Sequence, residues 1–200
     1  AELQIDESVA IFGQGVVGQL ISAFCRASGA YPVIAVDLDD NRLELSRKSG
    51  ATHTVNPTKV DAVCTVRDIA GDGAQTVIHA NRDPEVLIDC LKSAAKLGKI
   101  ILAGSPPGTV KLGLQVELLR WALDIRGVAR PGTKDNPHPY WPWTHQRDRS
   151  AIMRMIATSD LNVDHLISHV VKPESANDVY AKIAAGPKGW MGIFFDWDSP

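Results

Sequence analysis

Residues 8–18 read SVAIFGQGVVG, a short apolar run followed at once by glycines at positions 13, 15 and 18. The run Val9–Phe12 is typical of a buried strand. Apolar residues then recur at helical spacing, at Val17, Leu20, Ile21 and Phe24. The glycines therefore form G-x-G-x-x-G between a strand and a helix, which is the context in which this motif binds a dinucleotide. A plain strand–turn–helix connection is the alternative interpretation.

Each position of this loop has an expected task. Gly13 would permit the tight turn, Gly15 the close approach of a pyrophosphate, and Gly18 the contact between helix and strand. Val16 and Val17 open the helix, where unpaired N–H groups and the positive end of the helix dipole attract phosphates. These five residues are candidate cofactor-binding residues.

An acidic residue follows the second predicted strand, residues 32–36. Asp37 stands where a carboxylate accepts hydrogen bonds from both hydroxyls of an adenosine ribose and repels a 2′-phosphate. Leu38, rather than an arginine, comes next. A turn or capping role is the alternative for Asp37, although Asp39 and Asp40 are better placed to cap the next helix. The pattern predicts NAD, rather than NADP, as the cofactor.

The rest of the chain continues the alternation of strand-like and helix-like segments to about residue 129. Further strands are expected at 52–55, 76–79, 99–103 and 124–129. Helices are expected at 40–48, after a turn and cap at 56–58, and around 87–94. Such βαβ units predict an α/β fold, a doubly wound parallel six-stranded Rossmann sheet. A C-terminal helix–strand tail would follow, with helices around 152–156 and 176–183 and strands at 166–171 and 191–195.

The predicted organisation is a single NAD-binding domain over residues 1–200, with its core at about 6–130, a loop at 130–148 and the tail at 149–200. The loop is rich in proline and aromatic residues. It has two interpretations, a lid or subunit contact near the nicotinamide, and an Ω-type loop that packs its own aromatic side chains.

Composition excludes several classes of protein. The 21 basic and 23 acidic side chains give a net charge of −2, so we expect no nucleic-acid partner. The uncharged stretch 8–25 contains three glycines and two glutamines, so a membrane span is the poorer interpretation and no membrane partner is expected. The three cysteines, Cys25, Cys64 and Cys90, form no C-x-x-C pair, which fits a reducing, cytoplasmic compartment.

Beyond the glycine motif, the sequence resembles the zinc-type medium-chain alcohol dehydrogenase/reductase superfamily. The segments that carry the resemblance are VAIFGQGVVG (9–18), AVDLDDNRLEL (35–45), SGATHTVNP (49–57), LAGSPPG (102–108) and LISHVV (166–171). They follow the family's order over nearly the whole chain. The resemblance implies hydride transfer between NAD(H) and a small alcohol or carbonyl substrate.

The resemblance also implies roles for individual residues. Arg42 would lie near the adenosine ribose, and Ala80 and Asn81 beside the adenine. Backbone groups of Ala103, Ser105 and Val128 would face the nicotinamide carboxamide. The sequence departs from the family at the end of the fourth strand, where a glycine is usual and HANR (79–82) stands here, and at Met191, where a basic residue is common. Neutralisation of the pyrophosphate would then depend more on the helix dipole, or on groups outside this chain.

In the family, a catalytic zinc is held by Cys, His and Cys or Glu ligands that precede the cofactor domain. Only 12 residues precede Gly13 here, and none is Cys or His. We therefore expect the catalytic zinc-ligand domain to lie outside this chain, zinc to act only through it, and the chain alone to be inactive. No catalytic or metal-binding residue is predicted within the chain.

Histidines and cysteines elsewhere are expected to be structural. His165 and His169 are four residues apart, but their segment is strand-like, so packing is favoured over metal binding. His138 and His145 are expected at the surface. Cys25 and Cys90 fall on apolar helix stripes and predict core positions, and Cys64 has no adjacent base.

Two other function classes are alternatives to the enzyme, a non-enzymatic NAD-binding regulatory module and a methyltransferase. The tail after residue 129 argues against the first, because a minimal sensor does not need it. Gly18 and the GSPPG turn at 104–108 argue against the second. The family resemblance further implies a homodimer, paired through the sheet edge near 100–108 and 124–132.

Overall fold

The computed structural model describes residues 1–128, 144–186 and 189–198. Its centre is a parallel six-stranded sheet in the order β3-β2-β1-β4-β5-β6. The strands are β1 (Val9–Phe12), β2 (Val33–Val36), β3 (His53–Val55), β4 (Ala74–His79), β5 (Ala94–Leu102) and β6 (Asp124–Gly127). The order reverses between β1 and β4, as in the doubly wound dinucleotide-binding sheet. The prediction of a Rossmann-type α/β fold is confirmed.

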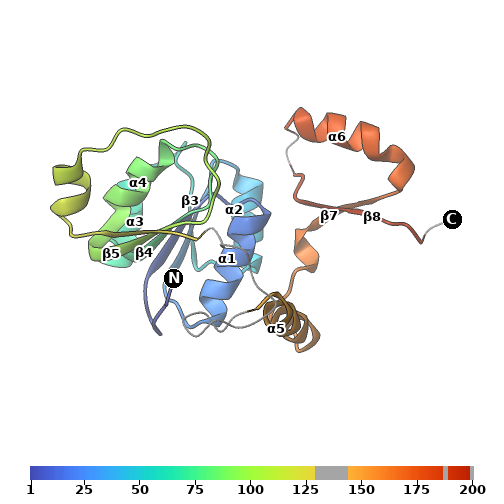
Figure 1. Ribbon diagram of the computed structural model, residues 1–200, viewed down its shortest axis with the longest axis horizontal. Coiled ribbons are helices and arrows are strands. Elements are labelled where there is room, and N and C mark those ends of the chain that lie inside the picture. Colours follow the sequence, from blue (N-terminus) through green and yellow to red (C-terminus); the bar gives the residue numbers. More distant parts are fainter. Residues whose placement is uncertain (129–143, 187–188, 199–200) are drawn as a thin grey trace.

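Helices cover both faces of this sheet (Figure 1). One face carries α1 (Val16–Ala27) and α2 (Asp40–Lys48), and the other carries α3 (Ala62–Ala70) and α4 (Val86–Ser93). None of the helices in the described parts of the chain is long and apolar enough to span a membrane.

The two layers of core follow from the alternation of side chains along each strand. Val9 and Ile11 of β1 are fully buried and pack with Cys25 of α1. Ala10 and Phe12 point to the opposite face and join the larger cluster under α3 and α4, which includes Leu91. A strand buried on both faces reads as a continuous apolar run, which is why Val9–Phe12 shows no polar alternation.

The tail forms a separate small layer beside α1 and α2 (Figure 1). It comprises α5 (His145–Ala157), the short helix η2 (Asp164–Leu166), β7 (Ile167–Val171), the short helix η3 (Pro173–Ser175), α6 (Ala176–Ala184) and β8 (Gly192–Phe195). Strands β7 and β8 pair in parallel as a two-stranded sheet. The tail contacts the core at the end of α2, where the Ser49 hydroxyl lies 2.7 Å from Nε2 of His165.

Several predicted boundaries are corrected by the structure. The cap of α3 is Asp61, whose carboxylate accepts from the Cys64 N–H at 2.8 Å, and not the 56–58 segment. Asn56 instead closes a turn by accepting the Thr58 N–H at 2.9 Å. Strand β5 begins at Ala94, directly after α4 and five residues earlier than expected, because a register shift in its pairing with β4 lets Ala94 join the sheet.

Two further differences concern the segment after β5. A short π-helix, η1 (Leu114–Leu119), lies between β5 and β6 and was not predicted. Helix α5 begins at His145, so the last residues assigned to the 130–148 loop are helical, and β6 ends at Gly127 rather than at 129. Thr144 caps α5 by accepting the Arg147 N–H at 3.2 Å. Residues 129–143 lie outside the described residues, so neither interpretation of that loop is tested.

Candidate functional site

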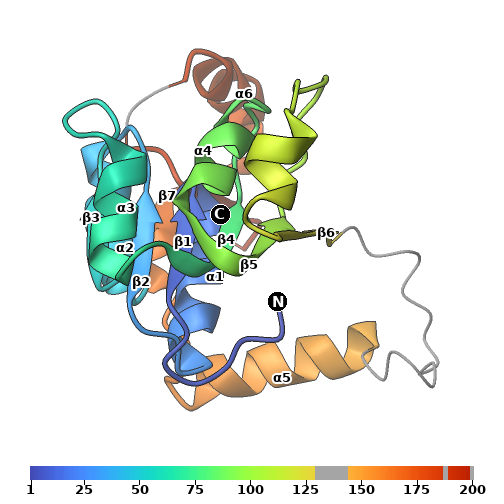
Figure 2. The same cartoon turned by 90° about the vertical axis from the view of Figure 1, so that its left-hand side faces the viewer.

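One row of paired residues brings five strand ends to the same edge of the sheet (Figure 2). Phe12 pairs with both Val36 and His79, His79 pairs with Leu102, and Leu102 pairs with Gly127. The residues that follow this row are Asp37, Gly13, Ala80, Ala103 and Val128. With neighbouring strands about 4.8 Å apart, the row is about 19 Å long. The candidate cofactor-binding residues, which come from segments far apart in the sequence, therefore lie along one edge of the sheet. Their order along this edge is the order of the strands, β2-β1-β4-β5-β6.

The three glycines of the loop differ in what a side chain at each position would meet. Gly13 has a φ of +101°, and a Cβ there would lie 2.8 Å from the carbonyl oxygen of Ala80. A Cβ on Gly18 would lie 1.9 Å from the carbonyl oxygen of Gly13. Both positions are therefore required by the fold itself. A Cβ on Gly15, by contrast, meets nothing within 4 Å, and its φ is −68°.

Gly15 thus leaves open space at the N-terminus of α1. No side chain caps this helix, and its first turn contains no acidic residue. Val16 and Val17 at its start are exposed. The first N–H groups of a helix have no partner within the helix and attract anions. Packing among the described residues does not require glycine at position 15, and a phosphate group seated on these N–H groups would occupy the open space beside it.

Asp37 is held against the glycine loop. Its Oδ2 accepts from the backbone N–H of Gln14 at 2.7 Å, and its Oδ1 accepts from that of Asp39 at 2.9 Å. The side chain is only 9% exposed, and the half-exposed Arg42 lies 3.8 Å from Oδ2. A carboxylate has room for about four hydrogen bonds, so the two backbone contacts leave acceptor positions for the hydroxyls of a ligand.

The ends of β4 and β5 touch one another beside the loop. A Cβ on Gly104 would lie 2.3 Å from the carbonyl oxygen of Asn81. The Asn81 side chain accepts from the Asp83 N–H at 2.9 Å, which makes a local turn of the kind that asparagine favours. This turn follows β4 directly and fixes the backbone that contacts Gly104.

The residues predicted for the nicotinamide end lie at the exits of β5 and β6. The Ala103 N–H donates to the His79 carbonyl at 3.0 Å, and the Val128 N–H donates to the Leu102 carbonyl at 3.3 Å. Both N–H groups are therefore engaged within the sheet. Ser105 lies in the exposed turn that follows β5.

Sequence reasoning missed a buried polar cluster under the glycine loop. It consists of Gln14, Gln19, Ser22 and Ser46, all with fully buried side chains. The available signal was the presence of Gln19 and Ser22 on the helix face that otherwise packs against the sheet. We define these four residues as the loop-support cluster.

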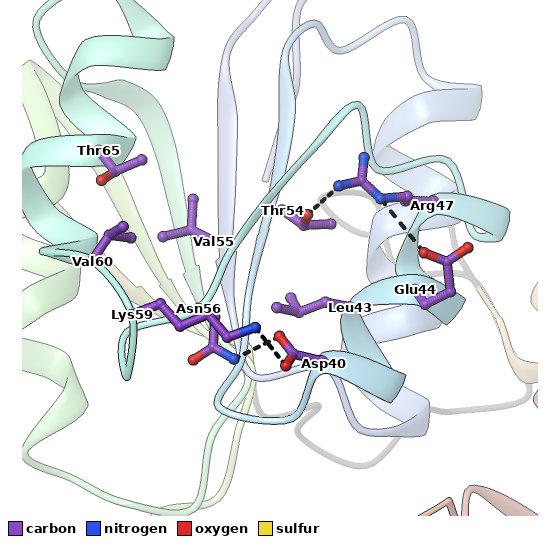
Figure 3. Close-up of a pocket in the computed structure, with 10 residues that line it drawn as sticks. All are labelled: Asp40, Leu43, Glu44, Arg47, Thr54, Val55, Asn56, Lys59, Val60 and Thr65. Atoms are coloured by element: carbon purple, nitrogen blue, oxygen red, sulfur yellow. Dashed lines mark hydrogen bonds and ion pairs between the residues drawn. The ribbon is translucent and has the colours of Figure 1, made fainter.

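A cavity of about 430 Å³ lies beyond the β2 end of this row, between α2, β3 and the start of α3 (Figure 3). Its lining residue Val55 pairs with Val36 of the row. Its charged groups are compensated locally, since the Lys59 ammonium lies 2.7 Å from Asp40 and the Arg47 guanidinium donates to Thr54 at 2.6 Å. None of the predicted cofactor residues lines it. The cavity is therefore not the site that the glycine motif predicts.

Other groups with potential chemistry make structural contacts. His165 contacts Ser49, and the ring of His169 of β7 packs against that of Trp190, with centroids 4.1 Å apart and a tilt of 34° between the planes. His145 opens α5, Met191 donates its N–H to Ser168 at 2.9 Å, and His138 lies outside the described residues. In residues 1–128, 144–186 and 189–198, no three His, Cys, Asp or Glu side chains form a group that could hold a metal ion.

The cysteines do not form an activated nucleophile. Cys25 and Cys90 are buried, as predicted, and burial raises the pKa of the Cys25 thiol to about 12. Cys64 is exposed on α3, where the negative charge of Asp61 raises the pKa of its thiol. A raised pKa keeps a thiol protonated and unreactive at neutral pH.

Comparison with known proteins gives consistent matches. The family described as zinc-binding dehydrogenase matches residues 16–146. L-threonine 3-dehydrogenase from Pyrococcus horikoshii is 31% identical over 185 residues, which are 92% of this chain and 50% of that protein. The chain thus spans about half the length of the curated relatives it matches.

Solved structures agree in fold. Benzyl alcohol dehydrogenase from Acinetobacter calcoaceticus superposes with a TM-score of 0.82 at 23% identity, covering 98% of this chain and 51% of that one. A structure described as a zinc-binding dehydrogenase from Sinorhizobium meliloti, with NADP bound, gives a TM-score of 0.76 at 24% identity, covering 96% and 53%.

Proposed function

Since this chain belongs to the zinc-binding dehydrogenase family, we propose that it is the NAD(H)-binding part of an oxidoreductase acting on a small alcohol or carbonyl substrate. When bound, the nicotinamide supplies the hydride chemistry, and the protein supplies binding and orientation. The observation that carries the proposal is the open N-terminus of α1 at Gly15, next to the Asp37 carboxylate. The dehydrogenases it matches favour this function over a regulatory module or a methyltransferase.

The proposed placement follows the row of strand ends. The pyrophosphate would lie on the loop and first turn of α1, at Gly13, Gly15, Val16, Val17 and Gly18. Asp37 would accept from the adenosine ribose with Arg42 beside it, and Ala80 and Asn81 would flank the adenine. Ala103, Ser105 and Val128 would contact the nicotinamide carboxamide.

The choice of NAD over NADP is the part of this proposal that Asp37 governs. A hydrogen bond to a charged group contributes about 1.5–3 kcal/mol, so Asp37→Ala should weaken NADH binding about tenfold to a hundredfold. Fluorescence titration with NADH and NADPH measures both affinities in the two proteins. Tighter binding of NADPH than of NADH by the wild-type chain would overturn the assignment.

The zinc of the family has no matching site among the residues that the structure describes. No step through zinc can be derived from this chain, so we propose that the chain alone binds NAD(H) without catalysing turnover. The measurement is the NADH absorbance band during incubation with a panel of alcohols and aldehydes. Steady, zinc-independent turnover would contradict the proposal.

We also propose that two copies associate through the β6 edge of the sheet. Strand β6 is the last strand of the described sheet, with β5 on its inner side. Val128 beyond it is exposed, as are three apolar side chains of the preceding η1, namely Leu114, Val116 and Leu119. An exposed strand edge is usually covered in soluble proteins. Sedimentation equilibrium should give twice the chain mass, and a monomer at all accessible concentrations would count against the dimer.

A further inference from the structure

The loop-support cluster joins the glycine loop to two helices. Its members come from the loop (Gln14), from α1 (Gln19 and Ser22) and from α2 (Ser46). Buried polar groups cost free energy unless they are hydrogen-bonded. The cluster meets this cost only in part, because Gln19 Oε1 has no hydrogen-bond partner among the described residues. Packing alone does not explain why four polar side chains are buried below this loop, since apolar side chains would fill the same space at no such cost.

Every polar group of Gln14, in the backbone and in the side chain, makes a hydrogen bond. Its backbone N–H donates to Asp37 Oδ2 at 2.7 Å, and its side-chain Nε2 donates to the Ile11 carbonyl at 3.1 Å. Its own carbonyl accepts from Gln19 Nε2 at 3.2 Å. The peptide that faces Asp37 is thus fixed by contacts with β1 and α1 as well as by Asp37 itself.

The side-chain oxygen of Gln14 depends on Ser46. The Ser46 Oγ lies 2.9 Å from Gln14 Oε1 and 2.8 Å from the Arg42 carbonyl. A hydroxyl has one proton to donate. Donation to Gln14 leaves neither oxygen without a donor, because the Arg42 carbonyl also accepts from Gln19 Nε2 at 2.9 Å, whereas Gln14 Oε1 would otherwise depend on the Ser22 hydroxyl alone. Ser22 is farther from Gln14 Oε1, at 3.3 Å, and lies 3.0 Å from the Gly18 carbonyl.

We propose that Ser46, acting through Gln14, is a positioning residue that aims the Asp37 carboxylate at the adenosine ribose and so strengthens the preference for NADH over NADPH. This inference rests on the proposed function. Ser46 holds the Gln14 side chain, the side chain holds the Gln14 peptide, and the peptide N–H holds Asp37 Oδ2. A carboxylate oriented before binding needs no ordering when the ligand arrives, which raises affinity for the ligand that it fits.

The test compares Ser46→Ala with a matched control, Ser93→Ala. Ser93 lies on α4 and is as fully buried as Ser46, but its hydroxyl has no hydrogen-bond partner among the described residues. NADH and NADPH affinities are measured for both variants and the wild type, together with urea unfolding. In Ser46→Ala we expect the ratio of NADH to NADPH affinity to fall about threefold to tenfold, the value of one hydrogen bond. In Ser93→Ala the ratio should not change.

The affinity ratio separates positioning from a loss of stability. A partly unfolded variant loses NADH and NADPH binding by the same factor, so its ratio is unchanged. If Ser46→Ala does not fold, Ser46→Cys fills similar space with a weaker donor and carries the same expectation. An unchanged ratio in the folded variant overturns the inference and leaves the proposed function intact. Absence of NADH binding by the wild-type chain overturns the proposed function instead.

Discussion

Gly15 and Gly18 lie in the same motif but are constrained by different neighbours. The space around Gly18 is filled by the Gly13 carbonyl, whereas the space around Gly15 is open. The fold therefore requires glycine at position 18, whereas packing among the described residues leaves room for a side chain at position 15.

This contrast predicts that alanine destabilises the protein at position 18 much more than at position 15. Gly18→Ala should lower the free energy of unfolding by about 1–3 kcal/mol, because the helix must move away from the loop. Gly15→Ala should stay within about 1 kcal/mol of the wild type, because its backbone suits alanine and only the capping preference is lost. Urea unfolding of both variants measures this. Equal destabilisation of the two would show that Gly15 is also held by the fold.

Residues whose role depends on local sequence could be predicted. The glycines and Asp37 follow strands, so a strand prediction places them at the edge of the sheet without further information. The role of Gln14 could not be predicted, because its side chain is satisfied by Ser46, 32 residues later on another helix. Nothing in the spacing of a serine on a helix indicates that its hydroxyl will meet a buried amide.

At the scale of elements, strands with continuous apolar sequence were predicted within one or two residues, except for β5. Strand β5 follows α4 with no turn between them, so the sequence does not show that the chain enters the sheet at Ala94, five residues before the expected strand. The start of α5 is hidden from sequence reasoning because its cap, Thr144, stands next to a segment rich in proline and aromatic residues.

The contact between the tail and α2 predicts a pH dependence. Burial, helped by the nearby positive Lys48, lowers the pKa of His165 below its ordinary value, against the opposing effect of Asp164. The unfolded chain, with a histidine pKa of about 6.5, then binds more protons than the folded chain just below that pH. This contribution to stability is complete above about pH 6.5 and is lost as the pH falls toward the lowered pKa of the folded state.

His165→Gln tests this contribution, since glutamine can still bond to the Ser49 hydroxyl but does not titrate. Unfolding free energies of the variant and the wild type, measured between about pH 5 and 8, should converge in acid, with the wild type showing the steeper dependence. Parallel curves would contradict a role for His165.

At the scale of the whole molecule, the site is assembled from five strand exits that no single motif contains. The sheet order brings Asp37 next to the glycine loop and puts Val128 at the far end of the row. The doubly wound fold was predictable from the βαβ alternation, and with it the location of the site at the carboxyl edge. The contacts of the tail with the core were not predictable, because they are made between surface residues far apart in the chain, such as Ser49 and His165, and no local sequence pattern marks such residues.

The central claim is that a dinucleotide lies across the glycine loop at the N-terminus of α1. Calorimetric titration of NADH into the wild-type chain and into Gly15→Ala tests it most directly, because this substitution adds one methyl group where the chain itself has open space. We expect saturable binding by the wild type and at least tenfold weaker binding by the variant, a loss of about 1.4 kcal/mol in binding free energy. The free energy of unfolding of the variant should stay within about 1 kcal/mol of the wild type. Equal NADH affinity in the two proteins would contradict the central claim.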